Sequence, residues 1–132
     1  ALDDEMRERI AHHRGRRDDR WQTVDAPRDL PEVLQSLEHL RSPILVDCLT
    51  LWLSNCLLAD LDLDAASNRL VAALEKAPGP LVVVSNEVGF GIVPETPLGR
   101  RFRDEQGRLN QRVAQIADRA VLVVAGLPLL LK

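Results

Sequence analysis

Three short runs of consecutive apolar residues, separated by longer segments with helical periodicity, constrain the fold of this chain more than any other feature. The runs span residues 43–47, 81–85 and 120–124, and the segments between them span 50–58, 65–77 and 98–117. Continuous Val, Leu and Ile runs are typical of parallel strands that are buried on both faces and covered by helices. A chain of 132 residues is long enough to bury one core. The sequence therefore predicts a single α/β domain over residues 1–132, with three layers and a mostly parallel central sheet.

Residues that begin or end helices and strands delimit the rest of the chain. Asp29 is a capping acid and Pro31 suits a first helical turn, whereas Pro78-Gly79-Pro80 ends the helix before it. Pro128 cannot donate a backbone hydrogen bond, so the final apolar segment, residues 127–131, is expected at an edge of the sheet. The further predicted elements are a helix over 2–13, a strand over 21–24, a helix over about 31–40, a loop over 86–96 and a strand over 127–131.

Composition excludes several classes of protein. A net charge of −3 argues against general nucleic-acid binding, which usually needs a basic face. No apolar run approaches the roughly 18–20 residues of a membrane span, and the charged first residues are unlike a secretory signal. Cys48 and Cys56 lack the spacing of a metal site or a disulfide framework, so we expect reduced thiols in a cytoplasmic protein.

The carboxyl ends of parallel strands are where such folds bind ligands. This rule selects Asp47, at the end of the first apolar run, and Ser85-Asn86-Glu87, at the end of the second. Four apolar residues and an acid have the form of a Walker B strand, so Asp47 could hold Mg²⁺ beside nucleotide phosphates. It could equally cap the helix that is expected to start near Thr50.

The adjacent His12 and His13 are followed at once by an arginine-rich segment, Arg14-Gly15-Arg16-Arg17. A neutral imidazole can attack phosphorus, and guanidinium groups can hold the phosphates. Helical spacing places His13 on one face with Leu2, Met6 and Ile10, and His12 on the opposite face. We therefore expect His13 to face the protein and His12 to face solvent. The alternatives are a helix-terminal histidine beside solvated arginines, and a metal site, which adjacent helical residues seldom form.

A further charged patch begins at Arg100-Arg101-Phe102-Arg103-Asp104 and continues through Gly107 to Asn110-Gln111. It could be a solvated helix start with charge pairs between successive turns. It could equally bind a polar substrate or a neighbouring subunit.

Together these motifs resemble the bifunctional adenosylcobinamide kinase / adenosylcobinamide-phosphate guanylyltransferase family of cobalamin biosynthesis. The resemblance covers essentially the whole chain. The segments that carry it are 2–6, 9–13, Trp21 and Thr23, 84–95, 101–104, Gly107, Asn110-Gln111 and 125–132.

The resemblance implies a RecA-like P-loop fold and an enzyme that uses ATP and GTP as substrates, with Mg²⁺. Such an enzyme phosphorylates adenosylcobinamide and then transfers GMP from GTP to adenosylcobinamide phosphate through a GMP-histidine intermediate. It further implies a homotrimer. Carried over by motif, the residue that becomes guanylylated is His13, and the residues that bind nucleotide are Arg14, Gly15, Arg16, Arg17, Asp25 and Asp47, of which Asp47 also binds the metal.

One departure from the family pattern is large. The family begins with a strand, a glycine-rich phosphate loop and a helix, and no G-x-x-x-x-G-K-[ST] motif occurs in these 132 residues. We expect either a partial sequence or a truncated form, and less readily a degenerate homologue. The competing hypothesis is a RecA-like binding or regulatory module that has lost its phosphate loop and is not catalytic.

Overall fold

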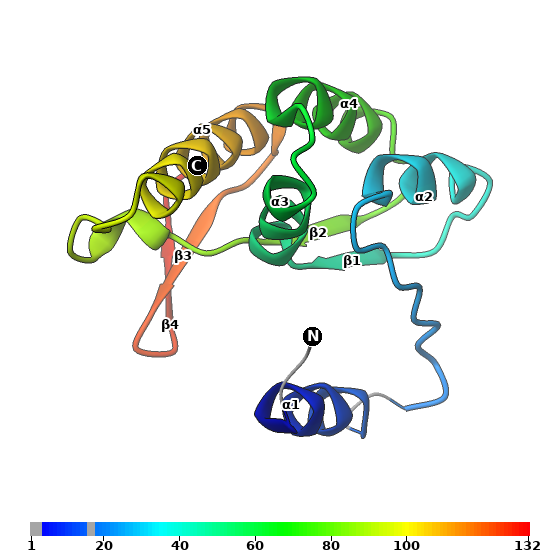
Figure 1. Cartoon of the computed structure of the whole chain (residues 1–132). Helices are drawn as coiled ribbons and strands as arrows, with labels where there is room; N and C mark the ends of the chain where they lie inside the picture. The colour runs from blue at the N-terminus through cyan, green and yellow to red at the C-terminus, as the bar shows by residue number, and fades with distance from the viewer. Residues whose placement is uncertain (1–3, 16–17) are drawn as a thin grey trace.

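The computed structural model describes residues 4–15 and 18–132, apart from the side chains of Met6, Arg9, His13 and Arg14. Figure 1 shows helices gathered on one side of a small parallel sheet, with a β-hairpin beside them and the first helix standing apart. The elements in chain order are α1 (Asp4–Gly15), α2 (Leu30–Ser36), β1 (Ile44–Asp47), α3 (Leu49–Leu58), α4 (Leu63–Glu75), β2 (Leu81–Val84), the 3-10 turn η1 (Val88–Phe90), α5 (Pro97–Ile116), β3 (Val121–Val124) and β4 (Leu127–Leu130).

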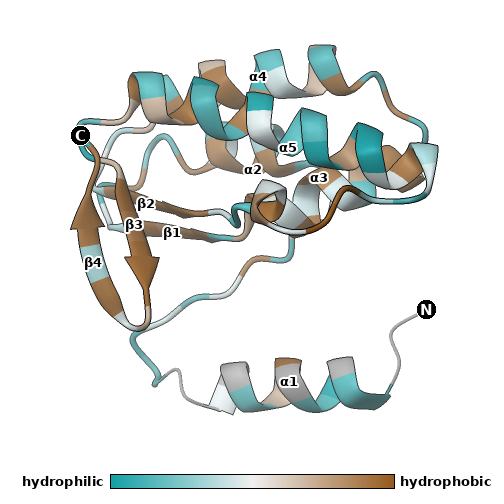
Figure 2. Ribbon diagram, turned by 90° about the vertical axis from the view of Figure 1, so that its left-hand side faces the viewer, coloured by the Kyte–Doolittle hydropathy of each residue, from teal (hydrophilic) through white to brown (hydrophobic). Residues whose placement is uncertain are grey.

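Strands β1 and β2 are parallel, as their apolar composition predicts, and pair from Ile44 with Leu81 to Asp47 with Val84. Alternation of side chains along each strand turns one set toward the helices and the other away from them. Val46 is buried in the core, whereas Leu45 and Val82 are exposed on the opposite face. Helices α2 to α5 all lie on the same side of this pair (Figure 2). The prediction of a sheet covered on both faces is therefore wrong for the part of the chain that the structure describes.

Strands β3 and β4 form a separate antiparallel hairpin instead of extending the parallel sheet. Ala125 and Gly126 both have positive φ, which suits the tight turn between two adjacent strands. A direct turn returns the chain beside the strand it has just left, so the pairing must be antiparallel. The prediction of a strand over 127–131 is confirmed, but its partner is β3.

The core lies between α3, α4 and α5. Leu53, Leu70 and Leu109 are fully or almost fully buried, one from each of these helices. Cys56 is also buried, and both cysteines are free thiols. Burial disfavours the thiolate and raises the pKa of Cys56 above its ordinary value.

Helices α4 and α5 begin with side-chain caps. Asp62 accepts a hydrogen bond from the backbone N–H of Ala65 at 3.0 Å, and Thr96 accepts one from Gly99 at 3.0 Å. Asp29 occupies the cap position of α2 and Pro31 lies in its first turn, as predicted, although the Asp29 side chain makes no capping bond. That helix ends at Ser36, earlier than expected, and continues as a turn.

The expected strand over 21–24 is wrong. These residues belong to the segment between α1 and α2, where Trp21 is 52% exposed and no strand is assigned. A strand is stable only with a neighbouring ladder, and this segment pairs with none of the described strands. None of the described helices is both long enough and apolar enough to cross a membrane.

Candidate functional site

The carboxyl ends of β1 and β2 bring the predicted strand-end residues together. Asp47 pairs with Val84, so Ser85 and Asn86 follow directly beside it. This juxtaposition confirms the expectation that Asp47 and the segment Ser85-Asn86-Glu87 share one edge of the sheet. The parallel direction of the two strands is its cause, since both chains leave the sheet at the same end.

Asp47 is exposed at the end of β1. The cap position of α3 belongs to Cys48, and no side chain makes a capping bond there. The structure therefore does not support the alternative in which Asp47 caps this helix. Its carboxylate remains accessible at the sheet edge, where it could contact a ligand or a cation.

Thr50, in the first turn of α3, holds Asn86 by two hydrogen bonds. The Thr50 hydroxyl donates to Asn86 Oδ1 at 2.9 Å, and the backbone N–H of Asn86 donates to Thr50 Oγ1 at 2.9 Å. Cys48 Sγ lies 3.9 Å from the same Asn86 Oδ1. The residue after Ser85 is therefore attached to the helix that follows the neighbouring strand.

A second set of hydrogen bonds joins this edge to α5. Gln106 Nε2 donates to Ser85 Oγ and to Asn110 Oδ1, each at 2.9 Å, and Ser85 Oγ donates to Asn110 Oδ1 at 2.6 Å. Asn110 Nδ2 donates to the carbonyl of Asn86 and to Glu87 Oε1, each at 3.1 Å. The side chains of Ser85, Glu87, Gln106 and Asn110 thus connect the end of β2 to the middle of α5.

The loop over 86–96 is attached to α5 at its far end as well. Arg100 Nη1 donates to the carbonyls of Pro94 and Glu95 at 3.0 and 2.7 Å. Gly99 is required for this approach, because a Cβ there would lie 2.8 Å from Pro94 Cβ. Between these attachments Phe90 and Ile92 are 78% and 96% exposed. The loop therefore presents apolar side chains from a backbone that is held at both ends.

The arginines of the charged patch at the start of α5 have two different roles, support of the loop and pairing with acidic residues of the same helix. Arg100 supports the loop, whereas Arg103 forms an ion pair with its neighbour Asp104 at 2.9 Å. Arg108 pairs with Glu105 one turn away at 2.8 Å. The pair Arg108–Glu105 matches the charge pairing between successive turns that the sequence allowed, whereas Arg103 and Asp104 are adjacent residues.

Helix α1 carries the histidine pair. His12 is exposed, as predicted, but the side chains of His13 and Arg14 lie outside the described part of the chain, as do Arg16 and Arg17 entirely. Gly15 is the last residue of α1. Both views show α1 apart from the other helices and joined to them by an extended segment (Figures 1 and 2). Of the apolar face that was expected to dock, the structure describes only the side chain of Ile10, which is partly buried, so the docking stays a prediction.

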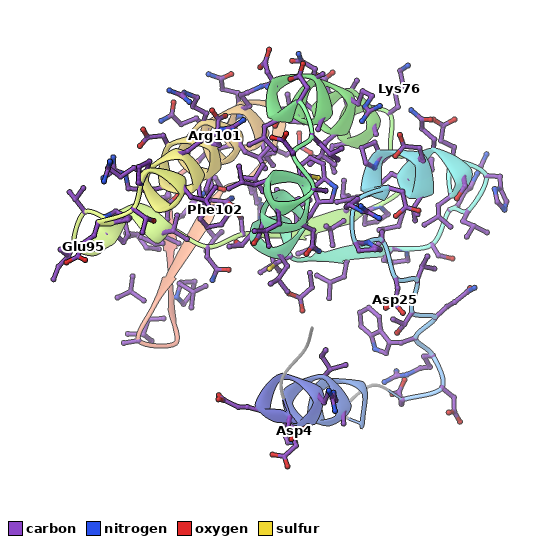
Figure 3. All side chains as sticks on the ribbon, in the orientation of Figure 1. Asp4, Asp25, Lys76, Glu95, Arg101 and Phe102 are labelled. Carbon is purple, nitrogen blue, oxygen red and sulfur yellow. The ribbon has the colours of Figure 1, made fainter. Side chains whose placement is uncertain are left out.

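The segment after α1 holds Arg20 and Asp25. Arg20 Nη2 pairs with Asp18 Oδ2 at 2.6 Å, and this hydrogen-bonded guanidinium lowers the pKa of Asp18. Asp25 is exposed and precedes the point where the segment joins the core. There Trp52 Nε1 donates to the carbonyl of Arg28 at 3.0 Å. Figure 3 shows Asp25 and Glu95 on opposite sides of the molecule, so the predicted nucleotide-binding Asp25 does not lie beside the loop.

Asp47 is the residue at the sheet edge that the sequence predicted as a metal ligand. Within residues 4–15 and 18–132, as far as they are described, no group of three or more His, Cys, Asp or Glu side chains could hold a metal ion. Mg²⁺ does not need such a group, since it is usually held by one or two carboxylates, water and substrate phosphates. Asp47 fits that mode of binding.

Gln106 and Thr50 belong to the site but were not predicted as functional residues. A signal for Gln106 is present in the sequence. Phe102, Gln106, Leu109 and Val113 share one face of α5, and Gln106 alone is polar on it. An amide at a core position of an amphipathic helix requires a hydrogen-bonding partner. Thr50 carries no comparable signal, because its partner is 36 residues away.

Comparison with known proteins gives a consistent result. A family model described as "Cobinamide kinase / cobinamide phosphate guanyltransferase" matches residues 1–131. A protein of Pseudomonas aeruginosa named bifunctional adenosylcobalamin biosynthesis protein CobP is 46% identical over 134 residues, which cover 100% of this chain and 78% of that protein. Proteins of Escherichia coli and Salmonella typhimurium named bifunctional adenosylcobalamin biosynthesis protein CobU are each 38% identical over 146 residues, covering 99% of this chain and 81% of theirs.

Proposed function

Since this chain belongs to the cobinamide kinase / cobinamide phosphate guanyltransferase family, we propose that it catalyses both reactions in cobalamin biosynthesis. It phosphorylates adenosylcobinamide with ATP or GTP, and it transfers GMP from GTP to adenosylcobinamide phosphate to give adenosylcobinamide-GDP. The observation that carries this proposal is a family match over almost the entire chain. The match favours an enzyme over a module without catalytic activity.

Guanylyl transfer is proposed to pass through His13. An unprotonated imidazole nitrogen attacks the α-phosphorus of GTP, a P–N bond forms, and the P–O bond to pyrophosphate breaks. An oxygen of adenosylcobinamide phosphate then attacks the same phosphorus, and the P–N bond breaks. Helical spacing favours His13 over His12 for this role, because it places His13 on one face with Met6 and Ile10 and His12 on the opposite face.

Nucleotide binding is proposed for Arg14, Gly15, Arg16, Arg17, Asp25 and Asp47. The arginines supply positive charge beside the histidine, in a chain whose net charge is −3. Asp47 would hold Mg²⁺ through its exposed carboxylate, together with phosphate oxygens of the substrate. When bound, the ion offsets negative charge on those phosphates.

Two wider features complete the proposal. The parallel pair β1–β2, with ligand groups at its carboxyl ends, is compatible with a RecA-like P-loop fold. A homotrimer is proposed from the family resemblance.

The test is covalent labelling with α-³²P-GTP in the full chain. Label should remain on the denatured protein, be released in acid and resist alkali, because a phosphoramidate has that sensitivity. Adding adenosylcobinamide phosphate before denaturation should discharge the label. Absence of label, while GTP binds, would contradict the proposed guanylyltransferase. A label that resists acid but not alkali would point to another linkage.

A further inference from the structure

Asn110 uses its whole hydrogen-bonding capacity within the site. A primary amide offers two N–H donors and two acceptor positions. Both donors are occupied, by the Asn86 carbonyl and by Glu87 Oε1, and Oδ1 accepts from Gln106 and Ser85. Exchanging its oxygen and nitrogen would set an acceptor against the Asn86 carbonyl and the Glu87 carboxylate. The orientation of Asn110 is therefore determined by its neighbours.

Gln106 supports Asn110 from the core. It is 0% exposed and lies one turn before Asn110 on α5. Its Nε2 makes two hydrogen bonds, yet its buried Oε1 has none among the described residues. A buried acceptor without a partner destabilises the fold, and an apolar side chain at this position would avoid that cost. The amide is therefore better explained by what it orients than by packing.

Glu87 is the residue that Gln106 and Asn110 together orient. Its side chain is exposed at the carboxyl end of β2, and Oε1 accepts from Asn110. Thr50 restrains the preceding Asn86 from the other side. Two elements, α3 and α5, thus place one accessible carboxylate at the edge that also carries Asp47. The other carboxylate of the loop, Glu95, lies at the outer margin of the molecule (Figure 3).

The two proposed reactions differ in their need for a proton acceptor. A phosphate monoester has a second pKa of about 6 and attacks as an anion, so guanylyl transfer does not require a base for its acceptor. The hydroxyl group of adenosylcobinamide keeps its proton until the O–P bond forms. A carboxylate within reach can accept that proton.

We propose that Glu87 is the general base of the kinase reaction and that Asn110 and Gln106 are positioning residues for it. The inference rests on the proposed function. The substrate hydroxyl oxygen bonds to the γ-phosphorus of the nucleoside triphosphate, and the bond from that phosphorus to the diphosphate oxygen breaks. The hydroxyl proton moves to the Glu87 carboxylate. Asn110 holds that carboxylate through Oε1, and Gln106 holds Asn110.

Separate measurement of the two reactions tests this assignment in the full chain. Glu87→Gln should reduce kcat for phosphorylation of adenosylcobinamide by about 10²–10⁴-fold, the range for loss of a general base. Labelling by α-³²P-GTP and discharge by adenosylcobinamide phosphate should stay within about threefold of wild type, since neither needs this base. An equal loss in all three measurements would overturn the proposal, as would an undiminished kinase rate.

Asn110→Asp tests positioning, because it retains size and Oδ1 but removes the donor to Glu87. We expect kinase kcat to fall at least tenfold with little change in KM for ATP. In the Glu87→Gln background the same substitution should cause no further loss, because it acts through Glu87. Additive losses would overturn the positioning role.

Two controls separate positioning from folding. Gln115→Glu makes an amide-to-carboxylate change at an exposed position of α5 and should leave both reactions unchanged. Gln106→Met removes the hydrogen bonds from Nε2 to Ser85 and Asn110 and replaces the amide with an unbranched apolar side chain of similar length. It should lower kinase kcat without lowering the unfolding midpoint. If the wild-type chain lacks both activities, the proposed function itself is contradicted. If the wild type is active and Glu87→Gln is equally active, only the role of Glu87 is contradicted.

Discussion

Adjacent residues on a helix point in directions about 100° apart, so His12 and His13 cannot serve the same purpose. His12 is exposed, and its neighbours on that face, Glu5 and Glu8, are exposed as well. Ile10, which shares the other face with His13, is only partly exposed. At the scale of single residues, the helical geometry therefore favours His13 as the nucleophile.

Substitution of each histidine in turn tests that choice. His13→Ala should abolish covalent labelling by α-³²P-GTP, because the attacking nitrogen is lost. His12→Ala should retain most of the label. The exposed His39 provides a matched control, and His39→Ala should label as wild type. Loss of label in His12→Ala with retention in His13→Ala would reverse the assignment.

Single helices in this fold depend on side chains just outside their first turn. The first backbone N–H groups of a helix have no partner within it, and a capping oxygen satisfies one of them. Asp62 does so for α4 and Thr96 for α5, whereas the cap position of α3 belongs to Cys48, which makes no such bond. Helix α3 instead gains its stability from burial of Leu49, Leu53 and Cys56.

The contribution of one cap can be measured on α4. Asp62→Ala should lower the free energy of unfolding by about 1 kcal/mol, since it leaves the N–H of Ala65 without its acceptor. Asp62→Asn should remain within about 0.5 kcal/mol of wild type, because Asn caps equally well. Urea titration followed by circular dichroism gives both values. If Asn is as destabilising as Ala, the carboxylate charge rather than the cap is the stabilising element.

In the molecule as a whole, one face of the parallel pair carries the core. Helices α2 to α5 cover that face, and the hairpin of β3 and β4 lies outside it (Figure 2). Because only one side of each helix faces this core, the same helix can contain a buried leucine and an exposed one. On α3, Leu53 is 0% exposed and Leu58 is 72% exposed.

These two leucines form a matched pair for measuring core stabilisation. Leu53→Ala should cost about 2–5 kcal/mol of unfolding free energy, because it removes buried methyl groups and leaves a cavity. Leu58→Ala should change it by less than about 0.5 kcal/mol, as is usual at exposed positions. Unchanged m-values in urea denaturation would show that the loss in Leu53→Ala is one of stability and not of cooperativity. Equal losses would contradict the position of the core.

Local patterns were sufficient for most of the elements. Apolar runs predicted β1, β2 and β3, and the helical pattern of the segments between them predicted α3, α4 and α5 to within about two residues of their observed bounds. These features depend on neighbours within one or two turns. The strand-end position of Asp47 and Ser85-Asn86-Glu87 followed as well, because parallel pairing alone places them together.

Contacts between distant segments were decided by the tertiary structure. A continuous apolar run indicates a strand but not its partner, so β3 could be predicted and its pairing with β4 instead of β1 or β2 could not. Likewise, the sequence by itself determined that Gln106 is an amide on an apolar helix face. Only the packing of α5 against the end of β2 decided that this amide meets Ser85 and that Asn110 reaches Glu87. Hydrogen bonds require donors and acceptors about 3 Å apart, and that distance is set by the fold across 21 to 25 residues of chain.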